Sequence, residues 1–482
     1  MPLKNINHAR SIAFIIRVGV ILVLLLFSIS QNTFSQDHNS TSLNAASTIS
    51  LTLTEAIDLA IRANRNLLQS GYGLQNQQLS LESTLSEFDL RIRPYSRAGV
   101  ADGEGIVGGG VGFDKKFSSG IRASLSPGIE WANDEYTSTT GVSLGIPLLK
   151  GFGQEVTLDS VYGSQFSLRT AERTTYMSRV NVALDTVLAA YDINKQTELV
   201  KLFTFQRDQL EGHATTARIK ERAGLATPID IYRAEIRQKD AENSLTTARE
   251  SLANAKDRLK LILSLSMEED IHVATPMVFE PVDITLDDAI RLALEHRIEI
   301  DQRKDDIAET HRNVDIAKHN LLPRLDLVVD YTRFGFSDEF RDKVWLPGED
   351  RWAFYLSSDT DWVRKREKIA YSQSLLRVKI AQLNLTQQQD EIKREVRRQL
   401  QALGKDLERI QIRREQLRQA EEKLALAKIK FHYRMADNFD VIATDTDRQR
   451  ARVDLLSTEI DYIVGTYRLR SVLGTLIEKK TG

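Results

Sequence analysis

The chain contains a tandem repeat, and this feature constrains its fold more than any other. Residues 52–61 open with Thr-Leu-Thr-Glu-Ala-Ile, and residues 285–294, which lie 233 positions later, open with Thr-Leu-Asp-Asp-Ala-Ile. A second echo pairs 217–220 and 229–231 with 427–430 and 439–441, at a shift of 210. Self-similarity at a long period is typical of one architecture built twice. We therefore expect one pseudo-symmetric body rather than two unrelated domains.

Both halves show the same predicted order of elements. A short helix capped by Thr54 or Asp287 leads into a polar helix of about 25 residues, which ends at Pro94 or Pro323. Strand-like segments follow, and then come one very long helix, a turn and a returning helix. Neither half has the strand and helix alternation of a parallel sheet, so the pattern argues against α/β enzyme folds.

Composition excludes several classes of function. Charged residues make up 27% of the chain, but the net charge is only −2, so there is no basic excess for nucleic acid. The absence of cysteine excludes disulfides, thiol chemistry, cysteine-ligated metals and a lipid anchor on cysteine. The eight histidines show no ligand spacing, and no motif places a Ser/His/Asp set. We therefore predict no catalytic residue, no metal site and no cofactor.

The first 35 residues are predicted to be a cleaved secretory signal peptide. Lys4, Arg10 and Arg17 supply a positive start, an apolar run covers 18–27, and 33–35 end in a small-x-small pattern. Cleavage would leave 62 basic and 67 acidic residues, because the segment holds three of the 65 cations and none of the acids. An uncleaved anchor helix starting near Ile12 is the alternative, although Arg17 interrupts it.

Four segments alternate apolar and polar residues at period two, which is typical of a sheet with one face in water. Each segment alone fits an ordinary half-buried strand equally well, so both interpretations stay open. The strand count in the first half is also open, since 97–113, 118–131 and 140–148 are three candidate runs for two expected strands. The apolar positions are Ile121, Ala123, Leu125, Ile129, Trp131, Val142, Leu144, Ile146, Leu148, Leu325, Leu327, Val329, Tyr331, Trp352, Phe354 and Leu356.

These strands bear on how the chain could cross a membrane. After the signal peptide, no segment has the ~18 consecutive apolar residues of a membrane-spanning helix. A membrane-crossing form would then need a closed β-barrel, since only helices and closed barrels satisfy all backbone groups in lipid. About four strands per chain cannot close a barrel, for which about eight is the smallest workable number. Three chains with four strands each would supply twelve.

Two proline-free stretches predict very long helices, from Gln154 to about Arg222 and from Trp362 to about His432. Roughly 70 residues at 1.5 Å per residue would give a rod of about 100 Å. In the second stretch, large apolar residues recur at steps of three, four and seven, which is typical of a coiled-coil seam. A soluble coiled-coil scaffold would show the same seam. The seam residues are Leu400, Leu403, Leu407, Ile410, Leu417, Leu424 and Phe431.

Each rod is predicted to end in a short turn, at 223–228 in the first half and at 434–438 in the second. Gly224 suits a helix C-terminus, and Pro228 suits the first turn of the next helix. Asp230 and Asp440 each lie near the start of a returning helix. Stabilisation of the helix dipole explains both aspartates as well as a functional role does.

In this combination the chain resembles the TolC-like outer-membrane efflux protein family. The resemblance covers about 51–478 and rests on the order and duplication of motifs that are each weak singly. These motifs are the repeated Ala56-Ile57 and Ala289-Ile290 openings, the strand-to-helix junction from Pro147 to Gly153, and the tip Ala223-Gly224-Leu225 followed by Asp230.

The resemblance implies an α+β membrane protein. It would be a homotrimer with a twelve-stranded β-barrel in the outer membrane of a Gram-negative bacterium, four strands per chain, continuing into a coiled-coil α-helical barrel in the periplasm. Its expected function is the exit duct of a tripartite efflux pump or type I secretion system. Its expected partners are outer-membrane lipid, a periplasmic adaptor (membrane fusion) protein and an inner-membrane pump of RND or ABC type. The open alternative is a soluble periplasmic coiled-coil adaptor or scaffold.

The resemblance also assigns residues. Ala223, Gly224 and Leu225, with Asp230, Arg434 and Met435, match the tips that dock the adaptor. Asp440 matches the first of two aspartates that ring the periplasmic entrance, where three copies would make it cation-preferring. Ala443 stands at the second aspartate position, and Phe431 and Ala436 replace the gate-locking tyrosine and arginine of the best-known members. The resemblance therefore does not imply a locking network, and whether the entrance is locked at rest stays open.

The expected organisation is a signal peptide over 1–35 and a linker over 36–50. A first repeat over 51–283 and a second repeat over 284–478 follow, and 479–482 form a tail.

Overall fold

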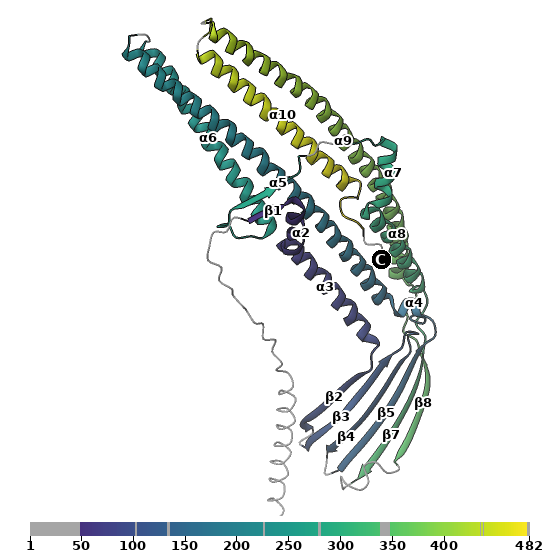
Figure 1. Cartoon of the computed structure of the whole chain (residues 1–482). Coiled ribbons are helices and arrows are strands. Elements are labelled where there is room, and N and C mark those ends of the chain that lie inside the picture. The colour runs from purple at the N-terminus through teal and green to yellow at the C-terminus, as the bar shows by residue number, and fades with distance from the viewer. Residues whose placement is uncertain are drawn as a thin grey trace, which may run out of the picture. The chain divides into compact units, whose positions relative to one another are not determined.

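The computed structural model describes residues 49–101, 104–132, 135–224, 227–277, 281–337, 348–433, 435–436 and 438–479. The predicted signal peptide and almost all of the predicted linker lie outside these ranges. Residues from Thr48 onward form one compact unit. In this unit a β-sheet lies at one end, and two long helical hairpins extend away from it (Figure 1).

The helical elements follow the same order in both halves. In the first half, α2 (Leu53–Ala63), α3 (Arg65–Leu85) and the 3₁₀ turn η1 (Ser86–Phe88) precede the sheet, and α4 (Gln154–Thr157), α5 (Asp159–Arg222) and α6 (Pro228–Leu263) follow its first strands. In the second half, α7 (Leu286–His296) and α8 (Ile298–His319) precede the last strands, and α9 (Lys365–His432) and α10 (Asn438–Val472) follow them. Two short strands, β1 (Ile49–Thr52) and β6 (Ile271–Ala274), pair in parallel beside α2.

The predicted long rods are confirmed as α5 and α9. Their 64 and 68 residues correspond to lengths of about 96 and 102 Å at 1.5 Å per residue. The helix expected from Gln154 is broken once, at Leu158, and the second rod begins at Lys365 rather than at Trp362. No helix in the described ranges is long and apolar enough to span a membrane.

The helix caps lie two residues earlier than predicted. Thr52, not Thr54, caps α2: its hydroxyl accepts the Glu55 N–H at 3.2 Å, and the Glu55 carboxylate accepts the Thr52 N–H at 2.8 Å. Thr285, not Asp287, caps α7 by accepting the Asp288 N–H at 3.2 Å. At Thr52 the physical reason is the capping box, because Glu55, three positions later, satisfies a second free donor. At Thr285 the hydroxyl donates to the Asp288 carboxylate at 2.7 Å, which holds the capping side chain in place.

The predicted proline stops are also wrong. Pro94 lies inside a strand, and α3 ends earlier, at Leu85, where Ser86 begins the η1 turn. Pro323 lies in the segment after α8, which already ends at His319. Proline prevents a helix from continuing through it, but it does not by itself mark where a helix ends.

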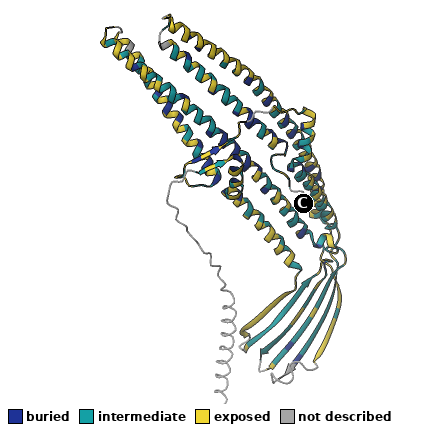
Figure 2. Cartoon of the chain, viewed as in Figure 1, coloured by how far each residue is buried: buried dark blue, intermediate teal, exposed yellow. Residues whose placement is uncertain are grey.

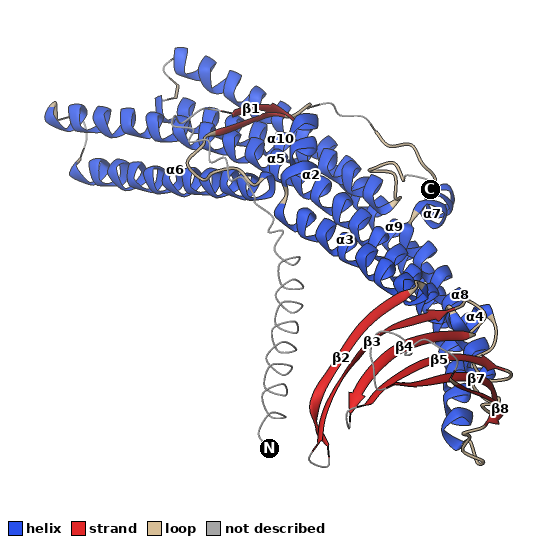
Figure 3. Ribbon diagram, turned by 90° about the horizontal axis from the view of Figure 1, so that it is seen from below, coloured by secondary structure: helices blue, strands red, loops and turns tan. Residues whose placement is uncertain are grey.

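Within the described residues the main sheet has six strands per chain, so the expectation of four is wrong. Their order is β2–β3–β4–β5–β7–β8, and every neighbouring pair is antiparallel. The first half supplies four strands and the second half supplies two. Figure 3 shows the sheet bowed across its width. The bounds are β2 (Arg91–Ala101), β3 (Glu104–Lys116), β4 (Arg122–Ala132), β5 (Glu135–Pro147), β7 (Asp326–Ser337) and β8 (Glu349–Ser357).

The missed strand comes from the candidate run 97–113, which is divided between β2 and β3, with Arg97 opposite Gly108. Glycines at 105, 108, 109, 110 and 112 hide the period-two pattern in β3 because they have no side chain to alternate. The sequence did hold a signal. Asp102 and Gly103, the two residues between these strands, form a pair that favours two-residue hairpin connections.

Two apolar cores hold the helices together. The first lies among α2, α5, α6 and the short sheet, and includes Tyr191 and Leu259. The second lies among α7, α9 and α10, and includes Ile410 and Tyr462. Both tyrosines reach a backbone partner: the Tyr191 hydroxyl donates to the Pro276 carbonyl at 2.7 Å, and the Tyr462 hydroxyl accepts the Val282 N–H at 2.9 Å.

Candidate functional site

The two faces of the main sheet differ sharply in chemistry. Directly paired residues of an antiparallel ladder share a face, so the register defines rows that cross all six strands. One row is entirely apolar and consists of Ile92, Phe113, Leu125, Val142, Tyr331 and Trp352. The adjacent row, on the opposite face, consists of Arg91, Asp114, Ser124, Ser143, Asp330 and Ala353. We call the two sides the apolar face and the polar face.

The apolar face has large side chains that no described part of the chain covers. On β8, Trp352, Phe354 and Leu356 are 62%, 68% and 63% exposed. Tyr331 and Trp352 pack together, with ring centroids 4.6 Å apart. A contiguous exposed apolar surface of this kind marks contact with lipid or with a partner.

The polar face is held by ion pairs and hydrogen bonds between strands. Arg93 pairs with Asp114 and Arg97 pairs with Glu130, and the Tyr355 hydroxyl donates to Asp330 at 3.1 Å. Because charged and hydroxyl groups lie on this face, it suits contact with water.

The first helical hairpin ends in a tight turn at the predicted tip. Ala223 caps α5 and donates its N–H to the Ile219 carbonyl at 3.2 Å. Gly224 has a φ of +69° and donates its N–H to the Glu221 carbonyl at 2.8 Å. This left-handed backbone favours glycine, as the sequence predicted. Leu225, the third predicted tip residue, lies outside the described residues.

The second hairpin ends without a glycine. The Tyr433 N–H donates to the Ile429 carbonyl at 3.1 Å, and the Met435 N–H donates to the Lys430 carbonyl at 2.8 Å. Met435 is 75% exposed. Arg434 lies outside the described residues. Both hairpin tips lie at the end of the unit away from the main sheet (Figure 1).

The structure places the two predicted aspartates on different hairpins. Asp440 lies in the first turn of α10 and is exposed, and its carbonyl accepts the Thr444 hydroxyl at 2.9 Å. Asp230 lies in the first turn of α6, which begins at Pro228, and its side chain lies outside what the structure describes. The two residues are not brought together within one chain, and the pore-ring role of Asp440 stays a prediction.

Large apolar side chains are exposed on both tips, and our sequence reasoning did not single them out as a group. Figure 2 shows exposed residues along both hairpins up to their tips. An exposed apolar cluster at a hairpin tip offers a surface for a partner or for another copy. We call these residues the tip clusters: Ile219, Ile229, Tyr232 and Ile236 on the first hairpin, and Ile429, Phe431, Tyr433 and Met435 on the second.

The predicted seam of α9 is confirmed in its middle part and is wrong at its end. Leu403, Ile410 and Leu424 are buried, and Leu400 and Leu407 pack partly buried against the second core. Phe431, in contrast, is exposed and belongs to the second tip cluster.

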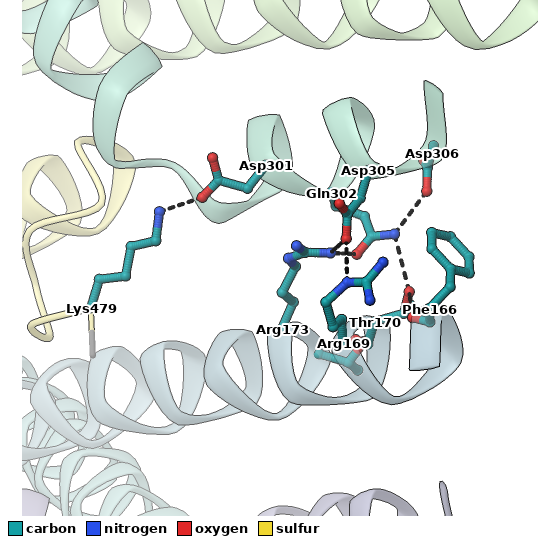
Figure 4. Close-up of polar contacts among 10 residues, drawn as sticks. Phe166, Arg169, Thr170, Arg173, Asp301, Gln302, Asp305, Asp306 and Lys479 are labelled. Carbon is teal, nitrogen blue, oxygen red and sulfur yellow. Dashed lines mark hydrogen bonds and ion pairs between the residues drawn. The ribbon is translucent and has the colours of Figure 1, made fainter. Parts of the chain in front are cut away.

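A polar cluster joins α5 of the first repeat to α8 of the second. The sequence analysis did not predict it. Asp305 on α8 accepts from Arg169 and Arg173 on α5, both at 2.9 Å (Figure 4). The Gln302 side-chain oxygen accepts a hydrogen bond from the Arg173 guanidinium at 2.9 Å, and its amide nitrogen donates to the Thr170 hydroxyl at 3.1 Å. Burial opposes ionisation of Asp305, but the two arginines outweigh it and hold its pKa below the ordinary value. The cluster therefore fixes α8 against α5.

A second missed residue, Arg297, fixes the start of α8 against the last two helices. Its guanidinium binds Glu299 at 2.5 Å, Glu395 of α9 at 3.0 Å and the Val472 carbonyl at the end of α10 at 3.2 Å. No local sequence pattern predicts the role of Arg297, because its partners Glu395 and Val472 are 98 and 175 positions away.

Comparison with known proteins rests on structure rather than on sequence. No family model matches the chain, and no curated protein matches it significantly in sequence. The Campylobacter jejuni CmeC outer membrane channel is similar in structure, with a TM-score of 0.68 and 13% identity, over 94% of this chain and 95% of that chain. The Vibrio cholerae outer membrane protein VceC is similar with a TM-score of 0.65 and 14% identity, over 88% and 96%. CusC, known for transmembrane channel formation, is similar with a TM-score of 0.66 and 13% identity, over 92% and 96%.

At these identities the likeness establishes the fold. The chain has the α+β fold of these outer membrane channels, in which a sheet continues into long helical hairpins. The fold expected from the resemblance to TolC-like proteins is thereby confirmed, apart from the number of strands.

Proposed function

We propose that three copies of this chain form an outer-membrane exit duct, part of a tripartite efflux pump or type I secretion system. In this assembly the sheets line a pore through the outer membrane of a Gram-negative bacterium, and the hairpins form a tunnel in the periplasm. The tips receive a periplasmic adaptor protein, which connects the duct to an inner-membrane pump of RND or ABC type. The duct itself catalyses nothing.

The observation that carries this proposal is the division of one sheet into two faces. Trp352, Phe354 and Leu356 lie on the apolar face and are more than 60% exposed, whereas Arg93 and Asp114 lie on the polar face. Side chains that alternate between lipid and an aqueous lumen are typical of membrane-spanning β-structure. The fold shared with known outer membrane channels supports the same function.

The second candidate is a soluble periplasmic coiled-coil scaffold with a β-domain. The long hairpins suit it as well as they suit a tunnel. The uncovered apolar face argues against it, because water around Trp352 and Phe354 would cost roughly 25 cal/mol for each Å² of apolar surface left exposed.

A matched pair of β8 variants tests the proposal. Phe354→Arg places a charge on the apolar face, where it should cost about 2–4 kcal/mol near the middle of a bilayer. Ala353→Arg, one residue away, places the same charge on the polar face. Sucrose-gradient fractionation with heat-modifiable gel migration then measures how much trimer reaches the outer membrane.

We expect the parent protein and Ala353→Arg to form outer-membrane trimers and Phe354→Arg to lose most of them. A parent protein that stays in the periplasmic fraction would support the scaffold instead. A Phe354→Arg variant with normal outer-membrane trimer yield would show that the apolar face does not contact lipid. Cross-linking in cells, followed by identification of the captured proteins, tests the adaptor and the pump.

A further inference from the structure

The two repeats contribute unequally to the sheet, since the first supplies four described strands and the second supplies two, and β2 and β3 are the first pair. These two strands form a hairpin at one edge, so the open edges of the sheet are β2 and β8. Residues 91–100 of β2 are exposed, and so is all of β8 except Ala353, which is half-buried (Figure 2). The β2 edge is eleven residues long and the β8 edge is nine. Open edges carry unpaired backbone groups, which a folded protein normally covers or pairs.

The β2–β3 hairpin has the same two-faced pattern as the other four strands. On the apolar face, Ile92 and Phe113 continue the row formed by Leu125, Val142 and the β7–β8 aromatics. On the polar face, Arg91 and Asp114 continue the row that ends at Asp330 and Ala353. A hairpin lying outside a membrane wall would have no reason to maintain this alternation.

Tyr95 ties the hairpin to the rest of the sheet. It lies opposite Gly110 of β3, which lies opposite Gly128 of β4. A Cβ atom built on Gly110 or Gly128 would lie only 2.7 or 2.4 Å from the Tyr95 hydroxyl oxygen. The side chain therefore extends from β2 over β3 to β4, in space that only glycine leaves open. This contact favours one continuous wall.

We infer that the sheets of three copies close into a single wall of eighteen strands, with β8 of each copy pairing with β2 of the next. The inference rests on the trimer of the proposed function. Six strands are fewer than the eight or so that the smallest closed barrel needs, so one chain cannot close on itself. Because the six strands alternate in direction, β2 and β8 run opposite to each other, and their union is antiparallel like every other pair of the sheet.

Proline does not prevent this union. Pro94 lies in β2 and removes one backbone donor from that edge. Pro127 lies in β4, which pairs on both sides, so the sheet already contains a proline inside its wall. A wall of twelve strands would instead require β8 to pair with β4 of the next copy, which means that the β3–β4 ladder and the Tyr95 contact must break.

The strand number sets the width of the pore. With strands about 4.8 Å apart and tilted by about 40°, eighteen strands give a wall roughly 36 Å across, against roughly 24 Å for twelve. Side chains reach about 5 Å inward on each side, which leaves an aqueous bore of roughly 25 Å. The outer segment would then be a wide vestibule that admits bulky hydrated solutes, while the helical tunnel keeps its own width.

Cysteine cross-linking distinguishes the two walls, and the absence of native cysteine leaves no background. Ala353→Cys on β8 is combined in turn with a cysteine at each polar-face position of β2. The control series combines it with polar-face positions of β4. Opposite residues of an antiparallel pair have Cα atoms about 4.5–5.5 Å apart, which suits a disulfide. The β2 positions are Arg91, Arg93, Tyr95, Arg97 and Gly99, and the β4 positions are Arg122, Ser124, Ser126 and Glu130.

The expected result is a covalent trimer from at least one β2 combination and from no β4 combination. Covalent trimers from the β4 series alone would overturn the inference. Electron cryomicroscopy of the parent trimer in lipid nanodiscs decides the question without any variant: eighteen strands in cross-section support the wide wall, and twelve refute it. A trimer with twelve strands leaves the proposed duct intact, whereas a failure to form outer-membrane trimers contradicts the duct itself.

Discussion

Replacing Leu424 of α9 by aspartate should separate the two helices of the second hairpin near its tip. Leu424 is only 6% exposed, and its neighbour Lys423 pairs with Asp447 of α10 at 2.8 Å, so α10 packs alongside at this level. Removing the buried leucine side chain forfeits about 2–3 kcal/mol. A carboxylate buried there without a partner costs several kcal/mol more, or else its pKa rises until it is neutral.

The sum, about 5 kcal/mol or more per chain, approaches the whole stability of many domains. Three chains carry the change in a trimer, so we expect little or no assembled Leu424→Asp protein. Leu424→Ala, which leaves a cavity but no charge, should lose about 2–4 kcal/mol and give an intermediate yield. Trimer yield is measured by heat-modifiable gel migration of outer-membrane extracts, and stability by loss of the helical circular dichroism signal at 222 nm on heating.

Ala425→Asp is the matched control, because Ala425 is the next residue of the same helix and is exposed. It introduces the same charge and loses about 0.5–0.7 kcal/mol of helix propensity. If Leu424→Asp and Ala425→Asp assemble and melt alike, then Leu424 does not lie in a seam that holds the hairpin together, and the reasoning fails.

Three further predictions concern the tips, the entrance and the polar cluster. Gly224→Val should weaken capture of the adaptor while trimers persist, because a β-branched residue at a φ of +69° is strained by about 1–2 kcal/mol. Gly224→Asn, the control, should weaken capture only slightly. Equal capture by both variants in a pull-down would contradict this prediction. In planar bilayers, Asp440→Asn should reduce both the cation preference of the channel and its block by multivalent cations, whereas Asp230→Asn should change these two properties much less. If both variants select ions like the parent, Asp440 only stabilises the start of its helix. The Asp305 pKa is lowered in the fold, so its stabilisation is complete above the unfolded carboxyl pKa of about 4 and disappears as pH falls through the folded value. The melting temperatures of the parent and Asp305→Asn should therefore differ from pH 5 to 7 and converge below about pH 4, and a constant difference would refute the role of the ionised carboxylate.

The helices were largely predictable because their signals are local and repeated. The capping box needs only the four consecutive residues from Thr52 to Glu55. The proline-free stretches predict the bounds of both long helices to within a few residues. The errors arose where two local signals compete. Thr54 is as good a capping residue as Thr52, and only the acidic residue three positions later chooses between them.

The sheet was predicted less well, for a different reason. Period-two alternation needs side chains, and β3 has glycine at five of its thirteen positions. Side chains that work through distant partners were not predictable at all. Arg297 binds Glu395 and Val472, and Asp305 binds Arg169 and Arg173, and in each case the fold alone brings the partners together.

The unequal repeats show how such a wall can change size. The β2–β3 hairpin leaves the helical end of the unit and returns to it, so the chain enters β4 from the side where it left η1. Inserting or deleting one hairpin therefore keeps the number of strands per chain even. The two edge strands still run in opposite directions, and α3 and α5 keep their places. In a threefold assembly the circumference can grow only in increments of six strands, while the number of helices stays constant. Pore width and tunnel width are thus independent variables of this architecture.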